Sequence, residues 1–186
     1  MATAQPPLCD FGWKARDFRL KGIDGKFHTL AEAKGSKGLL VMFICNHCPY
    51  VRAIVDRLVR DVRDLQKIGV GAIAVMANDT VSYPDDSFPN MKAFAARHGF
   101  TFPYVIDESQ DVARDWGAVC TPDFFGFNAN LELQYRGRLD ASRRDPAPKD
   151  ARRELYEAMA EVARTGQGPR AQNASMGCSI KWKSAA

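Results

Sequence analysis

The chain has 186 residues, of which 46% are hydrophobic, and this suits one domain with a buried core. The 26 basic and 22 acidic residues are interspersed and give a net charge of +4, so composition supports neither a nucleic-acid nor a membrane partner. No apolar run approaches the length of a transmembrane helix, and residues 1–10 lack the pattern of a secretory signal. We therefore expect a cytoplasmic protein, in which structural disulfides are rare.

The hydrophobic pattern predicts strands that alternate with helices. In the first half we expect a hairpin at 18–30, a buried strand at 39–44, a long amphipathic helix from about 45 to 68, a second buried strand at 70–77 and a polar loop at 78–90. In the second half we expect a helix at 90–98, a short strand at 103–106, a short helix at 107–117, a hairpin of 123–128 with 131–138, and a helix at 149–165. This order predicts an α/β fold with a mixed central sheet.

Cys45 and Cys48 stand where the first buried strand gives way to the long helix. A helix N-terminus carries a partial positive charge and free N–H groups, and both favour a thiolate over a thiol. Cys45 lies nearer the expected helix end, so we predict it to be the exposed, attacking thiol and Cys48 to be the resolving thiol. Asn46 and His47 lie between them, and a protonated His47 would stabilise the thiolate further.

A lone Cys-x-x-Cys motif is also half of a zinc site. A closed zinc site takes four ligands, and the sequence has no second Cys-x-x-Cys or Cys-x-x-His pair. His28 and His98 have no such neighbour and are expected at the surface. We therefore predict neither a metal ion nor another cofactor.

Three further features lie outside this motif. Thr121-Pro122 stands at a strand entry, where a proline is either cis or an ordinary turn residue. Cys120 is a candidate auxiliary thiol or a small buried apolar residue. Cys178 is a candidate resolving thiol, or an incidental thiol on a polar tail at 167–186 that follows a domain at 8–166. The four arginines between 136 and 144 suggest a solvated face.

The chain resembles the thioredoxin superfamily over about residues 10–166. The features that carry the resemblance occur in the family's order: the buried strand at 39–44, the Cys45–Cys48 motif and Thr121-Pro122. The hairpin at 18–30 and an insertion at 78–100, after the second core strand, resemble more narrowly its redoxin branch, which includes the peroxiredoxins (alkyl hydroperoxide reductase/thiol-specific antioxidant). The strings FICNHCPY, CTPDFF and GCSIKW resemble a bacterial group of uncharacterised thioredoxin-like proteins. The resemblance implies helices on both sides of the sheet and a Cys45/Cys48 redox pair. It also implies a cis Pro122 against that pair, with Thr121 offering backbone hydrogen bonds to a substrate chain.

Two departures bear on function. Asn46-His47 replaces the Gly-Pro of thioredoxins and is closer to the Pro-His of oxidising enzymes, and the peroxiredoxin signature is absent. We predict a thiol–disulfide oxidoreductase that acts on a protein or small-molecule disulfide and uses an external thiol reductant. The alternatives are a peroxiredoxin-like thiol peroxidase, which consumes hydroperoxide, and a non-enzymatic metal-binding or redox-sensing module.

Overall fold

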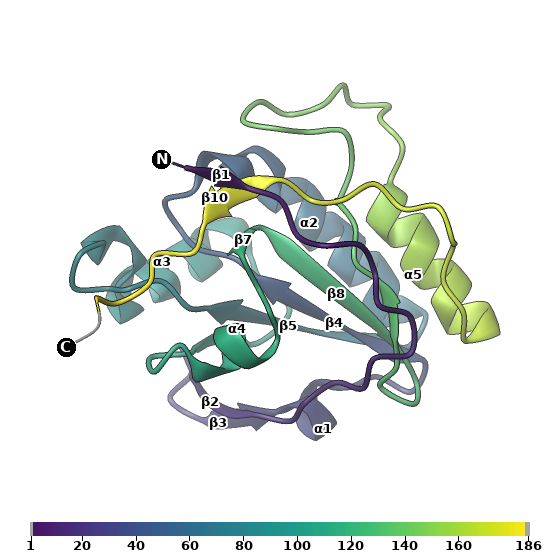
Figure 1. Ribbon diagram of the computed structural model, residues 1–186, viewed down its shortest axis with the longest axis horizontal. Coiled ribbons are helices and arrows are strands. Elements are labelled where there is room, and N and C mark those ends of the chain that lie inside the picture. The colour runs from purple at the N-terminus through teal and green to yellow at the C-terminus, as the bar shows by residue number, and fades with distance from the viewer. Residues whose placement is uncertain (1, 185–186) are drawn as a thin grey trace.

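The computed structural model describes residues 2–184 and contains a seven-stranded mixed sheet with helices on both faces (Figure 1). The strand order is β3-β2-β6-β5-β4-β8-β9. The central strands β4, β5 and β6 are parallel, whereas β2 and β8 pair antiparallel with β6 and β4. The strands are β2 (Arg19–Gly22), β3 (Phe27–Thr29), β4 (Gly38–Phe43), β5 (Val70–Met76), β6 (Tyr104–Ile106), β8 (Asp123–Asn128) and β9 (Leu133–Tyr135). The predicted α/β fold with a mixed sheet is confirmed.

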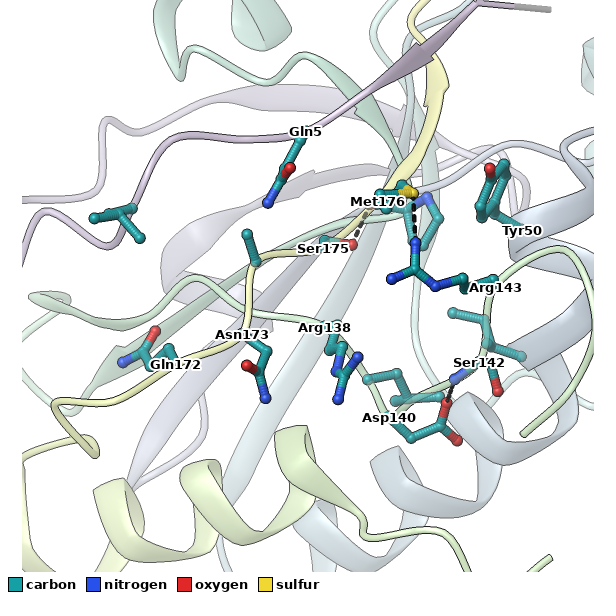
Figure 2. A pocket seen from close by; sticks show the side chains of 15 residues that line it. Gln5, Tyr50, Arg138, Asp140, Ser142, Arg143, Gln172, Asn173, Ser175 and Met176 are labelled. Carbon is teal, nitrogen blue, oxygen red and sulfur yellow. Dashed lines mark hydrogen bonds between the residues drawn. The ribbon is translucent and has the colours of Figure 1, made fainter. Parts of the chain in front are cut away.

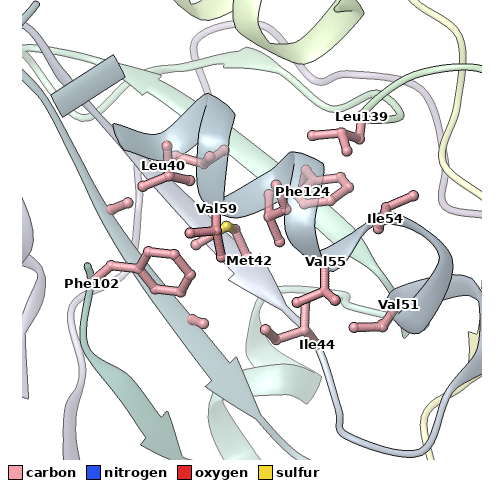
Figure 3. Packing of buried hydrophobic residues seen from close by; sticks show 14 of the residues in the cluster. Leu40, Met42, Ile44, Val51, Ile54, Val55, Val59, Phe102, Phe124 and Leu139 are labelled. Carbon is pink, nitrogen blue, oxygen red and sulfur yellow. The ribbon is translucent and has the colours of Figure 1, made fainter. Parts of the chain in front are cut away.

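The helices are α1 (Leu30–Ala33), α2 (Pro49–Lys67), α3 (Phe88–His98), α4 (Asp111–Asp115) and α5 (Glu154–Thr165), with a single 3-10 turn, η1 (Pro84–Asp86), before α3. Met42 and Ile44 pack against Val55 and Val59 of α2, as Figure 3 shows. The alternate β4 residues, such as Phe43, pack on the opposite face of the sheet, in a second buried cluster that includes Trp116. Because both faces of β4 are covered, its sequence is a continuous apolar run. Within residues 2–184, no helix combines the length and hydrophobicity needed to cross a membrane.

Three helices begin later than the sequence predicts, and one of them, α4, begins at Asp111 rather than at 107. Helix α2 begins at Pro49 and has Cys48 as its N-cap, so Cys45 lies in the loop before it. Proline fits the first helical position but disfavours helical backbone at the residue before it, and Cys48 accordingly has an extended conformation. Helix α5 begins at Glu154 rather than at 149, directly before its first buried residue, Leu155.

A second, three-stranded sheet was not predicted. It has the order β1-β10-β7, where β1 is Thr3–Ala4, β10 is Gly177–Ser179 and β7 is Cys120–Thr121. The segment expected to be a polar tail therefore contributes a strand, β10, that pairs with β7 directly before β8 (Figure 1). A Cβ atom on Gly177 would lie 2.0 Å from the carbonyl oxygen of Thr121, so only glycine permits this approach.

Candidate active site

Three thiols meet at the N-terminus of α2. Cys48 Sγ lies 3.1 Å from Cys178 Sγ and 3.0 Å from the carbonyl oxygen of Thr121. Cys45 Sγ lies 3.3 Å from Thr121 Oγ1. All three cysteines are free and buried. The structure therefore brings Cys45, Cys48, Thr121 and Cys178 together, although Cys178 is 130 positions from Cys48 in the chain.

The expected exposure of Cys45 is wrong, because both motif cysteines are completely buried. A hydrogen bond from the Cys45 thiol lowers the pKa of Cys48 to about 5, with a further contribution from the Cys178 thiol, although burial opposes the shift. The Thr121 carbonyl accepts a hydrogen bond from the protonated Cys48 thiol, so it also opposes the lowering of the Cys48 pKa. Burial, together with Cys48, raises the pKa of Cys45. The geometry thus favours Cys48, at the helix end, as the thiolate.

This assignment predicts a thiolate at moderately acidic pH. The ultraviolet absorbance of the reduced protein should contain a thiolate signal that titrates well below pH 9.0, the ordinary value for a cysteine. The signal should be absent from Cys48→Ser and retained in Cys9→Ser, since Cys9 lies outside the thiol cluster and burial raises its pKa to about 11. Equal low-pH signals from wild type and Cys48→Ser would show that another thiol carries the charge.

His47 is held by a carboxylate that the sequence analysis missed. Its Nδ1 lies 2.6 Å from Oδ2 of Asp86, and its ring stacks on Tyr83 with centroids 5.6 Å apart. The hydrogen bond to Asp86 raises the pKa of His47. Burial would raise the pKa of Asp86, but the hydrogen bonds from His47 and Asn78 lower it. Asp86 lies in a polar segment near a proline, and the residues of this segment show no periodic pattern.

Asn46 positions the loop instead of contacting a sulfur. Its side chain accepts a hydrogen bond from Tyr104 and donates one to the carbonyl of Asp85, at 3.0 and 3.1 Å. Its backbone N–H donates to Asp86 at 2.8 Å, and its carbonyl accepts from Arg52 at 2.9 Å. These contacts fix the backbone between Cys45 and Cys48.

The Thr121–Pro122 peptide bond is cis. The resemblance implied that Thr121 would offer its backbone to a substrate chain. Instead Thr121 pairs with Cys178 of β10, and the Pro122 carbonyl accepts a hydrogen bond from Ser175 at 2.8 Å. The C-terminal segment therefore covers this edge of the fold.

Comparisons with known proteins place the chain in a family. The model of the AhpC/TSA family matches residues 11–137. The chain belongs to the AhpC/TSA family. One curated relative is the thiol-disulfide oxidoreductase ResA of Geobacillus thermodenitrificans, which is 29% identical to this chain over 123 residues. That alignment covers 66% of this chain and 66% of the relative. The name of the relative denotes an enzyme class.

Solved structures agree on the fold. An uncharacterised conserved protein from Geobacillus kaustophilus is 38% identical, with a TM-score of 0.93 and coverage of 100% of this chain and 99% of that one. The thioredoxin domain of a thiol-disulfide oxidoreductase from Bacteroides vulgatus is 15% identical, with a TM-score of 0.64 and coverage of 82% and 97%. At that identity it shows the fold alone, which is thioredoxin-like. Together with the family match, this supports the predicted redoxin branch.

The remaining candidate residues make no hydrogen bond to the three clustered thiols among residues 2–184. Cys120 is buried with its thiol 3.4 Å from the Pro122 carbonyl, and burial raises its pKa. It therefore fits a small buried residue better than an auxiliary thiol. His28 and His98 lie beside Asp24 and Asp56.

One group of side chains has the composition of a metal site. Donor atoms of Cys45, His47 and Asp86 lie within 4.8 Å of one another. The Asp86 carboxylate is already shared among His47, Asn78 and the backbone N–H of Asn46. His47 Nε2 is buried and has no hydrogen-bond partner among residues 2–184. The cluster offers three donors, one fewer than a closed zinc site takes.

Proposed function

We propose that this protein is a thiol–disulfide oxidoreductase in which Cys48 and Cys45 alternate between dithiol and disulfide. The observation that carries the proposal is the position of Cys48 at the N-terminus of α2, with thiols of Cys45 and Cys178 lowering its pKa. A thiolate attacks disulfides, and the two neighbouring thiols are placed to resolve the product. The name of the ResA relative supports the same reaction class.

In the first step the Cys48 thiolate attacks one sulfur of the substrate disulfide. The substrate S–S bond breaks, a mixed disulfide with Cys48 forms, and the released thiolate takes up a proton. In the second step a neighbouring thiol loses its proton and attacks Cys48 Sγ, which releases the other half of the substrate as a thiol. The substrate gains two electrons and two protons, and an external dithiol later reduces the protein.

Cys45 and Cys178 are both candidates for the second step. Cys178 Sγ is 3.1 Å from Cys48 Sγ, and close strand pairing at Gly177 holds it there. Burial and the Cys48 neighbour raise the pKa of Cys178, so it is a proton donor at rest and not the attacking group. We propose that Cys178 is a second resolving thiol for Cys48.

The Cys45→Ser variant tests this role. Because Cys178 remains beside Cys48, we expect the pre-reduced variant to lose two thiols on treatment with bis(2-hydroxyethyl) disulfide and to form a Cys48–Cys178 bond. Peptide mapping by mass spectrometry under non-reducing conditions identifies the bond. The Cys45→Ser/Cys178→Ser double variant should stop at the mixed disulfide. If Cys45→Ser also stopped there, Cys178 would not be a resolving thiol.

Membership of the AhpC/TSA family favours a peroxidase as the second candidate. In that reaction a thiolate is oxidised by hydroperoxide to a sulfenic acid, which condenses with a neighbouring thiol and releases water. The same pre-reduced protein can be mixed separately with hydrogen peroxide and with a disulfide. Faster thiol loss with the disulfide at equal concentrations supports the oxidoreductase, and much faster loss with peroxide supports the peroxidase.

A further inference from the structure

A polar pocket of about 350 Å³ is lined in part by residues that neighbour the buried thiols in the chain. Its wall includes Tyr50, two positions beyond Cys48, and Pro122, which follows Thr121. It also includes Met176, two positions before Cys178. Figure 2 shows Tyr50 and Met176 at one end of the pocket, with Asn173 and Gln172 toward the other. The pocket wall therefore includes close chain neighbours of Cys48, Thr121 and Cys178.

One positive charge in this pocket has no acidic partner in the part of the chain that the structure describes. Arg138 is paired with Glu154 at 2.7 Å, and Asp140 is paired with Arg57 at 2.7 Å. Arg143 makes no ion pair among residues 2–184, and its guanidinium donates instead to Met176 Sδ at 3.0 Å. Figure 2 shows the Arg143 side chain extending from its loop toward Met176.

The expectation of a solvated basic face holds for Arg143 and Arg144, which are exposed, but not for Arg136 and Arg138. Arg136 is buried and paired with Asp123 at 3.0 Å. Of the charged residues that line the pocket, Arg138 and Asp140 are paired, which leaves Arg143 as the charge without an ion pair among residues 2–184. A thioether is a weak hydrogen-bond acceptor, whereas a carboxylate binds a guanidinium through two charge-assisted hydrogen bonds. A carboxylate entering the pocket would therefore displace Met176 from Arg143 favourably.

The covering of the thiols bears on substrate size. Cys45 and Cys48 have no exposed surface, and β10 occupies the edge of β7. A folded protein substrate would require β10 to leave, which breaks its pairing with both β1 and β7. A small disulfide in the pocket leaves that strand pairing in place, and the wall beside Cys178 contains Met176, an unbranched and adaptable side chain.

We propose that this pocket binds a low-molecular-weight disulfide that carries a carboxylate, with Arg143 holding the carboxylate while Cys48 attacks the disulfide. The inference rests on the proposed oxidoreductase function and names its substrate class. Arg143 is a specificity-determining residue, because it contacts the substrate away from the sulfur atoms. The electron balance is that of the two exchange steps above, with the substrate released as two thiols.

Two disulfides of similar size provide the test. 3,3′-Dithiodipropionate carries two carboxylates, and bis(2-hydroxyethyl) disulfide is neutral. The rate of thiol loss from the pre-reduced protein is measured with each, at increasing concentrations. We expect wild type to have the higher second-order rate constant for the dicarboxylate, and Arg143→Gln to lower that constant about tenfold while leaving the neutral one unchanged. Arg143→Lys should retain part of the preference, and salt should weaken it.

Arg152→Gln is the matched control, since Arg152 is exposed, paired with Glu157 and outside this pocket. It should behave as wild type toward both disulfides. If wild type showed no preference for the dicarboxylate, or if Arg143→Gln slowed both disulfides equally, the substrate assignment would be overturned and the oxidoreductase function would stand. If neither disulfide oxidised the thiols, the oxidoreductase proposal itself would fail.

Discussion

Replacing Cys48 with serine is expected to lower the rate of thiol–disulfide exchange by more than about a thousandfold, because it removes the nucleophile on which both steps depend. The hydroxyl of serine is not ionised at neutral pH, and the helix end that stabilises a thiolate has no comparable effect on it. Pre-reduced Cys48→Ser should therefore retain its thiols in the presence of bis(2-hydroxyethyl) disulfide, as followed by free-thiol titration.

Two other substitutions make this result specific. Cys45→Ser should still form the mixed disulfide, since Cys48 is intact, and Cys9→Ser should react as wild type. If Cys48→Ser formed a mixed disulfide while Cys45→Ser did not, the two roles would be those that the sequence alone suggested. Far-ultraviolet circular dichroism of each variant checks that the fold is retained.

Asp86→Ala is expected to destabilise the protein by about 3–5 kcal/mol, because it leaves buried donors without their acceptor. The Asp86 carboxylate is fully buried and accepts hydrogen bonds from Asn78, from His47 Nδ1 and from the backbone N–H of Asn46. Chemical denaturation of the reduced protein measures the change. Asp85→Ala is the matched control, because the side chain of Asp85 is exposed. This substitution should lower the free energy of unfolding by less than about 0.5 kcal/mol.

The penalty for Asp86→Ala should depend on pH in a defined direction. The pKa of His47 is raised above its ordinary value of 6.5. The contribution of His47 to the stability of the folded protein is therefore fully present below pH 6.5 and is lost as the pH rises through the raised pKa. The pKa of Asp86 is lowered below its ordinary value of 3.8. The contribution of Asp86 to the stability of the folded protein is therefore present above pH 3.8 and is lost as the pH falls through the lowered pKa. The penalty should therefore be largest between about pH 4 and pH 6.5. A penalty that grew toward pH 9 would contradict the ion pair.

The sequence predicts the central sheet well because both faces of β4 and β5 are buried and each strand is a continuous apolar run. It also identifies Cys45, Cys48 and Thr121-Pro122, which the fold brings together. The roles within the motif depend on where α2 begins. Pro49 sets that position, and its effect on the backbone of Cys48 was the available signal.

The rest of the site depends on long-range pairing that periodicity does not reveal. Strands β7 and β10 are two and three residues long, too short to give an alternating pattern, yet their pairing places Cys178 against Cys48. Asp86 lies in a single turn of 3-10 helix and contacts His47 only in the folded chain. The tight fit of Gly177 against Thr121 shows in retrospect why a glycine precedes Cys178.

The most direct test of the central claim is a map of the disulfide formed in one turnover. Pre-reduced wild-type protein is mixed with one equivalent of bis(2-hydroxyethyl) disulfide, acid-quenched, digested without reduction and analysed by mass spectrometry. The proposed chemistry predicts that two thiols are lost and that Cys48 is joined to Cys45 or Cys178. Recovery of Cys48 as a free thiol, with the disulfide consumed elsewhere or not at all, would contradict it.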